Sequence, residues 1–353
     1  MLRRRFLHVV VGLSGGVDSS VAAYLLQRQG HTVKGLFVTS WDSVEEHGEC
    51  TGEEDWRDVQ RVCHVLGISC ERKSFVSEYW MDVFEPLLSG YSKGETPNPD
   101  VRCNSKLKFR DMRNFVFASM GADRFATGHY AQLDRDATTG KMRLLQSPCD
   151  KDQTLFLSQV SGSQFEKCLF PVGHLDKEKV RSIAREAGLP NAEKKSSTGI
   201  CFVGKRKFGE WIGDYVDLTA GRFIDPHGNV LGSHNGAERF TLGQRARVGG
   251  ESRRWFVSNK TQSGDVVLSP QRAVTRHLRT RDTLWVAEQP PDEGHMMVDC
   301  RFRHTQPLQR AKMTVLGNDF CLDFEHDQAG VAPGQVVAVY QGQVCLGGGV
   351  IAS

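Results

Sequence analysis

A β-branched apolar run that leads through a turn of small residues into a helix places the strongest constraint on the fold. The run spans 9–11, the turn 12–16 and the helical segment 21–26. A strand, a small-residue turn and a helix in this order present free backbone N–H groups and a positive helix end to an anion. Gly15 and Gly16 lack a Cβ, so a ligand can approach their backbone closely. The stretch therefore predicts a phosphate site at the end of the first strand.

This loop is not of the Walker A type, because no Gly-Lys-Ser/Thr sequence ends it. Its sequence, Ser14-Gly-Gly-Val-Asp-Ser-Ser20, resembles the Ser-Gly-Gly-x-Asp-Ser-Ser loop of the PP-loop ATP pyrophosphatases, which cleave ATP to AMP and pyrophosphate. A glycine- and serine-rich turn that binds nothing is the alternative for any short motif of this kind. Seven matching positions in a strand-to-helix context favour the ATP site.

The first half of the chain alternates between strand and helix patterns. Candidate strands and helices follow one another at 32–38, 55–66, 68–75, 78–88, 105–120 and 125–127. Such alternation predicts an α/β domain with a doubly wound parallel sheet. Ligands of these sheets bind at the carboxyl ends of the strands. We therefore expect the loop at Gly12, the strand end at Val38 and the turn at Gly128 to face one crevice.

The second half of the chain has an all-β character. Glycine-rich turns separate short β-branched and aromatic runs after about residue 214, and helical spacing disappears. We expect a catalytic domain at 1–213, a small central β-rich domain at 214–286 and a C-terminal β-barrel at 287–353. The proline-containing stretch 287–292 suggests the second boundary, and a chain of 353 residues is long enough for three domains.

Composition excludes several classes of function. The formal charge of +3 is nearly neutral, so a nucleic-acid surface must come from local clustering. No apolar run is long enough for a membrane span, and we expect no membrane partner. The ten cysteines include no Cys-x-x-Cys pair and no zinc-type spacing, which predicts reduced, mostly buried thiols and no metal site.

Cys103 stands out because it follows a stiff, charged loop. Pro97 and Pro99 favour an extended segment that brings Asp100 close to the thiol, just before a helix. If Asn104 or Ser105 caps that helix, Cys103 lies at its positive end, where a thiol pKa is lowered. A proline-rich turn with an incidental cysteine is the alternative.

Cys201 is the second cysteine in an unusual setting. It follows a turn of small residues at 196–199, and Lys194, Lys195, Lys205, Arg206 and Lys207 flank it. Nearby cations favour the thiolate and suit a phosphate backbone. A buried cysteine in a strand is the alternative.

Seven motifs, in this order along the chain, make the sequence similar to the tRNA-specific 2-thiouridylases. They are Ser14–Ser20, Thr96-Pro-Asn-Pro-Asp100 with Cys103-Asn104, Ala126-Thr-Gly-His-Tyr130, Lys151-Asp-Gln153, Ser197-Thr-Gly-Ile-Cys-Phe202, Thr241-Leu-Gly-Gln-Arg245 and Cys345-Leu-Gly-Gly-Gly349. The resemblance implies a PP-loop domain of the adenine nucleotide α-hydrolase type, a small central domain and a C-terminal barrel. It also implies replacement of O2 of the wobble uridine by sulfur, after ATP adenylates that oxygen.

The resemblance assigns roles to individual residues. Cys201 would carry the sulfur as a persulfide, Cys103 would be the nucleophile that closes a disulfide with Cys201, and Asp100 would be the acid/base group. Asp18 would act through Mg²⁺ that accompanies ATP. The ATP site would comprise Gly12, Leu13, Ser14, Gly15, Gly16, Val17, Asp18, Ser19, Val38 and Gly128. The tRNA contacts would be Asn98, Pro99, Asp100, His129, Lys151, Asp152, Gln153, Arg301, Phe302 and Gln335.

The resemblance also implies partners and a compartment. The tRNAs would be those for Lys, Glu and Gln, and a sulfur carrier or cysteine desulfurase would donate the persulfide. The short loop at 245–250, with Trp41-Asp-Ser43 and Cys300-Arg-Phe-Arg-His304, is most similar to mitochondrial members. A mitochondrial matrix location is therefore expected, with the cytoplasm as the alternative, since the basic start 1–6 is at most the stub of a targeting segment.

Two other functions remain open at this stage. A PP-loop ligase of the argininosuccinate-synthetase kind would adenylate a small carbonyl substrate without thiols. A tRNA-binding protein with a degenerate ATP loop would bind tRNA without catalysis and would release no AMP.

Overall fold

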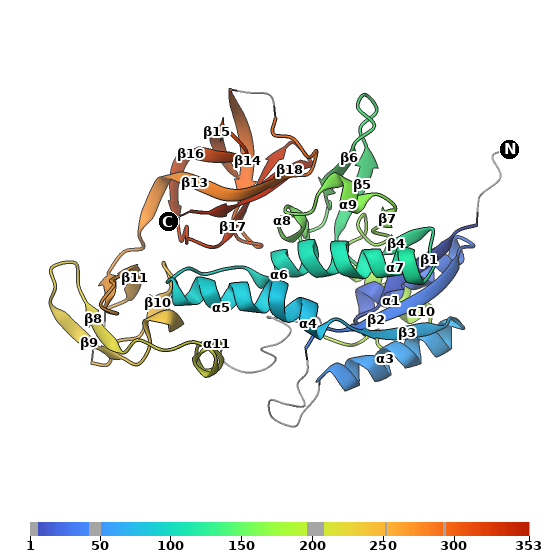
Figure 1. Cartoon of the computed structure of the whole chain (residues 1–353), viewed down its shortest axis with the longest axis horizontal. Coiled ribbons are helices and arrows are strands. Elements are labelled where there is room, and N and C mark those ends of the chain that lie inside the picture. Colours follow the sequence, from blue (N-terminus) through green and yellow to red (C-terminus); the bar gives the residue numbers. More distant parts are fainter. Residues whose placement is uncertain (1–5, 42–50, 196–207, 251–252, 292–293, 353) are drawn as a thin grey trace.

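The computed structural model describes residues 6–41, 51–195, 208–250, 253–291 and 294–352 (Figure 1). Three sheets organise this part of the chain: a five-stranded parallel sheet, a five-stranded central sheet and an eight-stranded antiparallel sheet. Cys201 and Cys50 lie outside the described residues. No helix in the described ranges is long and apolar enough to cross a membrane.

The parallel sheet confirms the predicted α/β class. Its order is β3-β2-β1-β4-β7, which places the first strand in the middle. The strands are β1 (His8–Gly12), β2 (Thr32–Thr39), β3 (Cys70–Ser74), β4 (Arg124–Ala126) and β7 (Cys168–Leu169). Because β2 and β4 run parallel to β1 on either side of it, all three strands end at the same edge.

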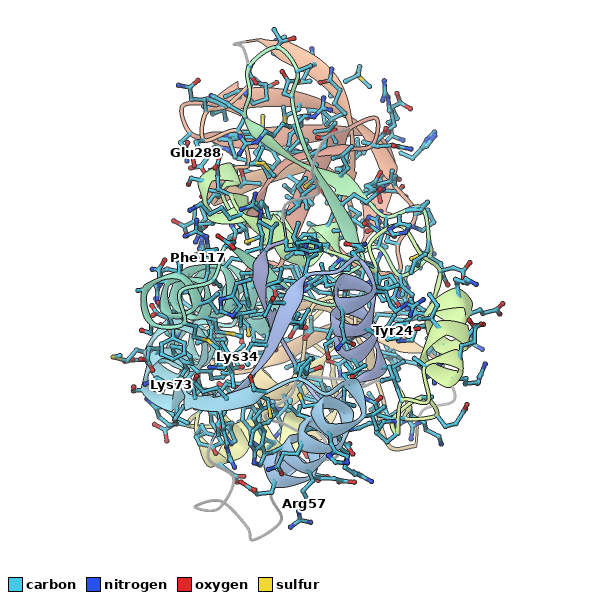
Figure 2. The ribbon with its side chains drawn as sticks, turned by 90° about the vertical axis from the view of Figure 1, so that its right-hand side faces the viewer. Tyr24, Lys34, Arg57, Lys73, Phe117 and Glu288 are labelled. Carbon is cyan, nitrogen blue, oxygen red and sulfur yellow. The ribbon has the colours of Figure 1, made fainter. Side chains whose placement is uncertain are left out.

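Both faces of the central strand β1 are covered, which explains its continuous apolar run Val9–Val11. Val9 and Val11 pack with α1 (Val17–Arg28), α3 (Thr51–Leu66) and α10 (Lys177–Glu186), whereas Val10 points into the opposite core. Tyr24 of α1 and Phe117 accordingly lie on opposite sides of the sheet in Figure 2.

Two long helical stretches cover the Val10 face. One spans α4 (Val76–Tyr79), η1 (Trp80–Phe84) and α5 (Glu85–Ser92), and the other α6 (Pro99–Arg102), η2 (Cys103–Met112) and α7 (Arg113–Ser119). The second stretch begins at Pro99, earlier than the predicted start at 105. Asn98 is its N-cap, accepting a hydrogen bond from the Asp100 N–H at 3.1 Å, and Pro99 at the first position has a φ suited to a helix. The expected placement of Cys103 at the helix N-terminus is therefore wrong.

The central sheet is small and has its own core. Its strands are β8 (Gly221–Ile224), β9 (Val230–His234), β10 (Arg245–Ala246), β11 (Trp255–Lys260) and β12 (Val266–Ser269). Short helices α11 (Phe208–Trp211), η3 (Ile212–Asp214) and η4 (Ala237–Arg239) precede or interrupt it. Trp255, Val257, Val266 and Leu268 form most of the apolar interior.

The C-terminal strands form a closed barrel. They are β13 (Val274–Trp285), β14 (His295–Arg301), β15 (Gln309–Leu316), β16 (Asp319–Ala329), β17 (Val336–Gln341) and β18 (Val344–Ile351). β13 pairs with both β16 and β18, and this double pairing closes the barrel. The structure thus places β13 in the barrel, whereas the sequence analysis expected it in the central domain. The chain passes between the two domains at 270–273.

A hairpin from the first domain extends the barrel sheet. β5 (Ala131–Arg135) and β6 (Met142–Gln146) follow β4 directly, and β6 pairs with β18 (Figure 1). The short helices α8 (Thr154–Leu157) and α9 (Gly162–Phe165) lie between this hairpin and β7. The hairpin therefore attaches the barrel to the domain that carries the phosphate loop.

Candidate active site

The loop after β1 has the geometry of an anion site. Gly15 has a φ of 74°, which glycine adopts without strain, and Gly16 caps α1 without offering a side-chain acceptor. The first-turn N–H groups of α1 thus remain available for a phosphate. The Ser14 and Ser19 hydroxyls lie 3.2 Å apart, and the Ser19 hydroxyl also accepts from the Ser14 N–H. These bonds fix the loop before any ligand arrives.

Gly128 packs directly against this loop. A Cβ at Gly128 would lie 2.6 Å from the Ser19 nitrogen and 2.7 Å from the Asp18 carbonyl carbon. Only a glycine lets the turn after β4 approach the start of α1 this closely. The structure therefore brings Gly128 together with the loop at 12–19, and Val38 lies on the neighbouring strand at the same edge.

Asp18 has a lysine as its cation partner. Lys177 Nζ lies 2.6 and 2.7 Å from the two carboxylate oxygens, and the Tyr130 hydroxyl donates to Asp18 Oδ1 at 2.7 Å. Burial, and then the charge of Asp18, raises the pKa of Tyr130, so the phenol stays protonated and donates. Lys177 is the first residue of α10. The N-terminus of this helix and the Lys177 ammonium group therefore both add positive electrostatic potential beside the phosphate loop.

Asn191 is a further residue of this region that the sequence analysis missed. Its amide donates to the Gly15 carbonyl at 2.9 Å and to the Ser20 hydroxyl at 3.0 Å, and it is buried. Its Oδ1 is buried without a partner in the described structure. Asn191 and Lys177 lie more than 150 positions after the loop, and no motif spacing marks them. Tyr130 belongs to a recognised motif, but its bond to Asp18 is visible only in three dimensions.

Asp100 and Cys103 occupy successive turns of one helix. Cys103 is buried in the core of the Val10 face, and Asn104 next to it donates to the Phe156 carbonyl at 3.1 Å. Met112, nine residues further along the same helix, and Phe125 of β4 are the side chains nearest to a Cβ built at Gly12, both at 3.6 Å. The helix that carries the nucleophile candidate therefore abuts the phosphate loop.

The carboxyl group of Asp100 lies in a poorly solvated position. Burial raises the pKa of Asp100, and the charges of Lys108 and His304 partly offset that effect. A raised pKa suits a carboxyl group that must exchange a proton near neutral pH.

The predicted tRNA contacts fall into two groups. Lys151 is exposed, and Asn98 and Asp100 are partly exposed. His129, Asp152 and Phe302 are buried, at 8%, 5% and 1% exposure. His129 packs between Phe109 and Phe170 and contacts the Thr127 hydroxyl at 2.7 Å, so its side chain lies in the interior. Burial lowers the pKa of His129 well below its usual range, which keeps it neutral.

Two of the predicted tRNA contacts, Arg301 and Asp152, join the barrel to the first domain. Arg301 of β14 forms a largely buried ion pair with Asp152 at 3.2 Å, and its guanidinium lies over the Tyr340 ring. Thr154 donates to Asp152 at 2.7 Å and lies 3.1 Å from the Tyr340 hydroxyl. Such a network orients the barrel against the segment 147–157.

Comparison with known proteins assigns the chain to a family. Three family models match consecutive parts: tRNA methyl transferase HUP domain at 7–205, tRNA methyl transferase PRC-barrel domain at 209–269, and aminomethyltransferase beta-barrel domain at 275–351. A tRNA-specific 2-thiouridylase of Streptococcus agalactiae is 42% identical, covering 98% of this chain and 95% of the relative. The chain belongs to the tRNA-specific 2-thiouridylase family. The relative from Alkaliphilus oremlandii is 43% identical over 97% of this chain and 96% of its own.

A solved 4-thiouridine synthetase–RNA complex with bound ATP aligns at 15% identity and a TM-score of 0.34, over 60% of this chain and 50% of that chain. The family models separate the two β domains between 269 and 275, the same place as the structure does. As a member of the thiouridylase family, the chain is a sulfurtransferase by class.

A protein-held Mg²⁺ does not fit the described residues. Both oxygens of Asp18 contact Lys177, and no cluster of three His, Cys, Asp or Glu side chains occurs in the described ranges. The action of Asp18 through Mg²⁺ that accompanies ATP stays a prediction, and we derive no step from the metal.

Replacement of Lys177 by methionine is expected to raise the KM for ATP about tenfold, because the Asp18 carboxylate would then face the phosphates without its cation. The readout is pyrophosphate release as a function of ATP concentration. Lys179→Met, an exposed site on the same helix, is the control and should leave KM unchanged. An unchanged KM in Lys177→Met would show that Lys177 does not serve the ATP site.

Asp100→Asn is expected to lower turnover by about 10²–10⁴-fold, the usual range for a lost acid/base group, while stabilising the fold at neutral pH. Because the folded-state pKa of Asp100 is raised, the carboxylate destabilises the fold once pH exceeds the ordinary carboxyl pKa. The melting temperature of Asp100→Asn should exceed that of the parent chain by a margin that grows from acidic to neutral pH. Asp217→Asn, at an exposed site, is the control. A margin that shrinks as pH rises would contradict the assignment.

Proposed function

We propose that this chain is an ATP-dependent tRNA 2-thiouridylase. It adenylates O2 of the wobble uridine and replaces that oxygen with sulfur from a cysteine persulfide, giving 2-thiouridine, AMP and pyrophosphate. The observation that carries the proposal is the position of Asp100 and Cys103 on one helix that abuts the phosphate loop at Gly12. Family membership over nearly the whole chain supports it.

The first step activates a poor leaving group. The uracil O2 attacks the α-phosphorus of ATP, the bond to the β-phosphate oxygen breaks, and pyrophosphate leaves. Asp100 takes the N3 proton of the base, so that O2 becomes the nucleophile. The N–H groups at the start of α1 and the Ser14 and Ser19 hydroxyls hold the phosphates, and Lys177 balances the charge of Asp18.

The second step transfers sulfur. The outer sulfur of a Cys201 persulfide attacks C2, and AMP departs with the former O2. Cys103 thiolate then attacks Cys201 Sγ, which releases 2-thiouridine and leaves a Cys103–Cys201 disulfide. A dithiol reductant restores the two thiols before the next turnover.

The target base must leave its stack to reach this site. Asn98 and Asp100 are partly exposed beside it, and Lys151 offers an exposed ammonium to the tRNA backbone. The tRNAs for Lys, Glu and Gln are the proposed substrates, and a sulfur carrier or cysteine desulfurase the persulfide donor. Mg²⁺ would arrive as the counterion of ATP. The mitochondrial matrix remains our proposed compartment, which imaging of the tagged full-length protein would test.

Adenylation is tested separately from sulfur transfer. The purified chain, ATP and tRNA are mixed without a sulfur donor, and pyrophosphate is measured. We expect release with a tRNA that carries uridine at the wobble position and none when cytidine replaces it. Equal release with both tRNAs, or none with either, would contradict the proposal.

A further inference from the structure

The loop that precedes the catalytic helix is held by the barrel. This loop, residues 93–98, connects α5 to α6 and leads within two residues to Asp100. Arg281 of β13 forms a two-pronged ion pair with Glu95, at 3.0 and 2.8 Å. The Glu95 side chain is only 13% exposed, and that of Arg281 is 40% exposed. Paired guanidinium–carboxylate contacts fix orientation as well as distance.

The backbone of Thr96 is bonded to the barrel on both sides. Its N–H donates to the Pro333 carbonyl at 2.8 Å, and its carbonyl accepts from Gln335 Nε2. Gly334 makes this approach possible, because its φ is 86° and a Cβ there would lie 2.9 Å from the Thr96 nitrogen. The predicted tRNA contact Gln335 is thus engaged with the loop.

The central domain adds weaker contacts. The Thr241 hydroxyl lies 3.4 Å from that of Thr96, and Lys260 donates to the Gly94 carbonyl at 3.5 Å. A small cavity, whose lining includes Glu95, Asn98 and Arg281, separates part of the loop from the barrel. Pro97, Val336 and Val350 also line this cavity, so apolar and polar groups both border it. The ion pair and the hydrogen bonds to Thr96 are the directional contacts that hold the loop.

The loop is rigidly connected to the catalytic helix. Pro97 packs against Gly90, where a Cβ would lie 2.2 Å from the proline ring, and Pro99 fixes the first helical residue. Asn98 caps the same turn. A shift of Thr96 therefore moves Asp100 and Cys103 with it.

We propose that Glu95 and Arg281 form a positioning ion pair through which the barrel sets the placement of Asp100 and Cys103 relative to the target base. Neither residue touches the reacting atoms. The inference rests on the proposed thiouridylase activity, and it adds that the barrel controls turnover as well as contacting tRNA.

The test compares Arg281→Ala, Glu95→Gln and the exchanged pair Glu95→Arg with Arg281→Glu. We expect both single variants to lower kcat for thiolation about tenfold or more, since small misplacements of reacting groups have large effects, and to leave the KM for tRNA within about twofold. The exchanged pair should recover most of the lost kcat, a coupling that a double-mutant cycle measures. Arg276→Ala is the matched control and should have wild-type kcat, because Arg276 lies on β13 like Arg281 but forms an exposed ion pair with Asp327 of β16.

The alkylation rate of Cys103 by iodoacetamide, followed by mass spectrometry, gives a readout independent of turnover. Loosening the loop should raise that rate at least about threefold in Glu95→Gln and Arg281→Ala, because the buried thiol is alkylated through local opening. Wild-type kcat and wild-type alkylation in both variants would overturn the inference. If Arg281→Ala fails to fold, the isosteric Glu95→Gln decides alone. A parent chain that makes no 2-thiouridine would contradict the proposed function instead, while the alkylation rates would still decide on the ion pair.

Discussion

Replacement of Cys103 or Cys201 by serine is expected to abolish 2-thiouridine formation, with a loss of at least about 10³-fold, because each group acts in a covalent step that a hydroxyl cannot perform. Pyrophosphate release in the presence of tRNA should persist, since adenylation precedes both cysteine steps. The two activities are measured on the same preparation, by nucleoside mass spectrometry and by a phosphate assay.

Cys321→Ser is the matched control for these variants. Cys321 lies on β16 of the barrel and is partly exposed. Its replacement makes the same chemical change outside the catalytic helix. It should retain full thiolation. Full activity in both Cys103→Ser and Cys201→Ser would exclude the persulfide route and favour a PP-loop ligase that needs no thiols.

The second large effect is expected at Gly128. An alanine there would place its Cβ within 3 Å of the backbone at Asp18 and Ser19, and backbone atoms cannot rotate away as a side chain can. We expect pyrophosphate release to fall about 10²-fold, because the start of α1 must move, and stability to fall by about 1–3 kcal/mol, as for other overpacked sites.

Gly249→Ala controls for the substitution itself. A Cβ at Gly249 meets no atom within 4 Å, so this variant should match the parent chain in melting temperature and turnover. If Gly128→Ala released pyrophosphate at the parent rate, the close approach of the β4 turn to the phosphate loop would have no functional role.

Local patterns in the sequence were sufficient to predict the first domain. The run at 9–11 is apolar on both faces, and its burial on both sides of the sheet confirms the parallel, doubly wound class. The turn at 12–16 follows because strand, glycines and helix are neighbours in sequence. The carboxyl ends of β1, β2 and β4 meet as predicted, since parallel pairing leaves no other arrangement.

Two boundaries in the structure differ from those predicted: the start of the barrel domain and the start of the helix that carries Cys103. The prolines and polar residues at 287–292 suggest a linker between domains, but β13 before this stretch and β14 after it both belong to the barrel, because β13 completes the barrel through long-range pairing. The helix begins at Pro99 and not at 105, because proline, which disfavours a helix interior, is favoured at the first helical position after an Asn cap.

Contacts between domains were not predictable from spacing. Glu95 and Arg281 are 186 positions apart, and Asp18 and Lys177 are 159 apart. Arg301 and Asp152 are both predicted tRNA contacts, and only the structure shows that they also pair with each other at 3.2 Å. A charge in the sequence does not reveal whether its partner is a nucleic acid or another side chain.

The central claim, that adenylation at the phosphate loop serves sulfur transfer to tRNA, is tested most directly by nucleoside mass spectrometry of a reconstituted reaction. The full-length chain is mixed with ATP, an unmodified tRNA for Lys, Glu or Gln, and a small-molecule persulfide donor. We predict one 2-thiouridine at the wobble position for each AMP released, and none when ATP or the persulfide is omitted. AMP release without any 2-thiouridine, or 2-thiouridine formation without ATP, would contradict this account.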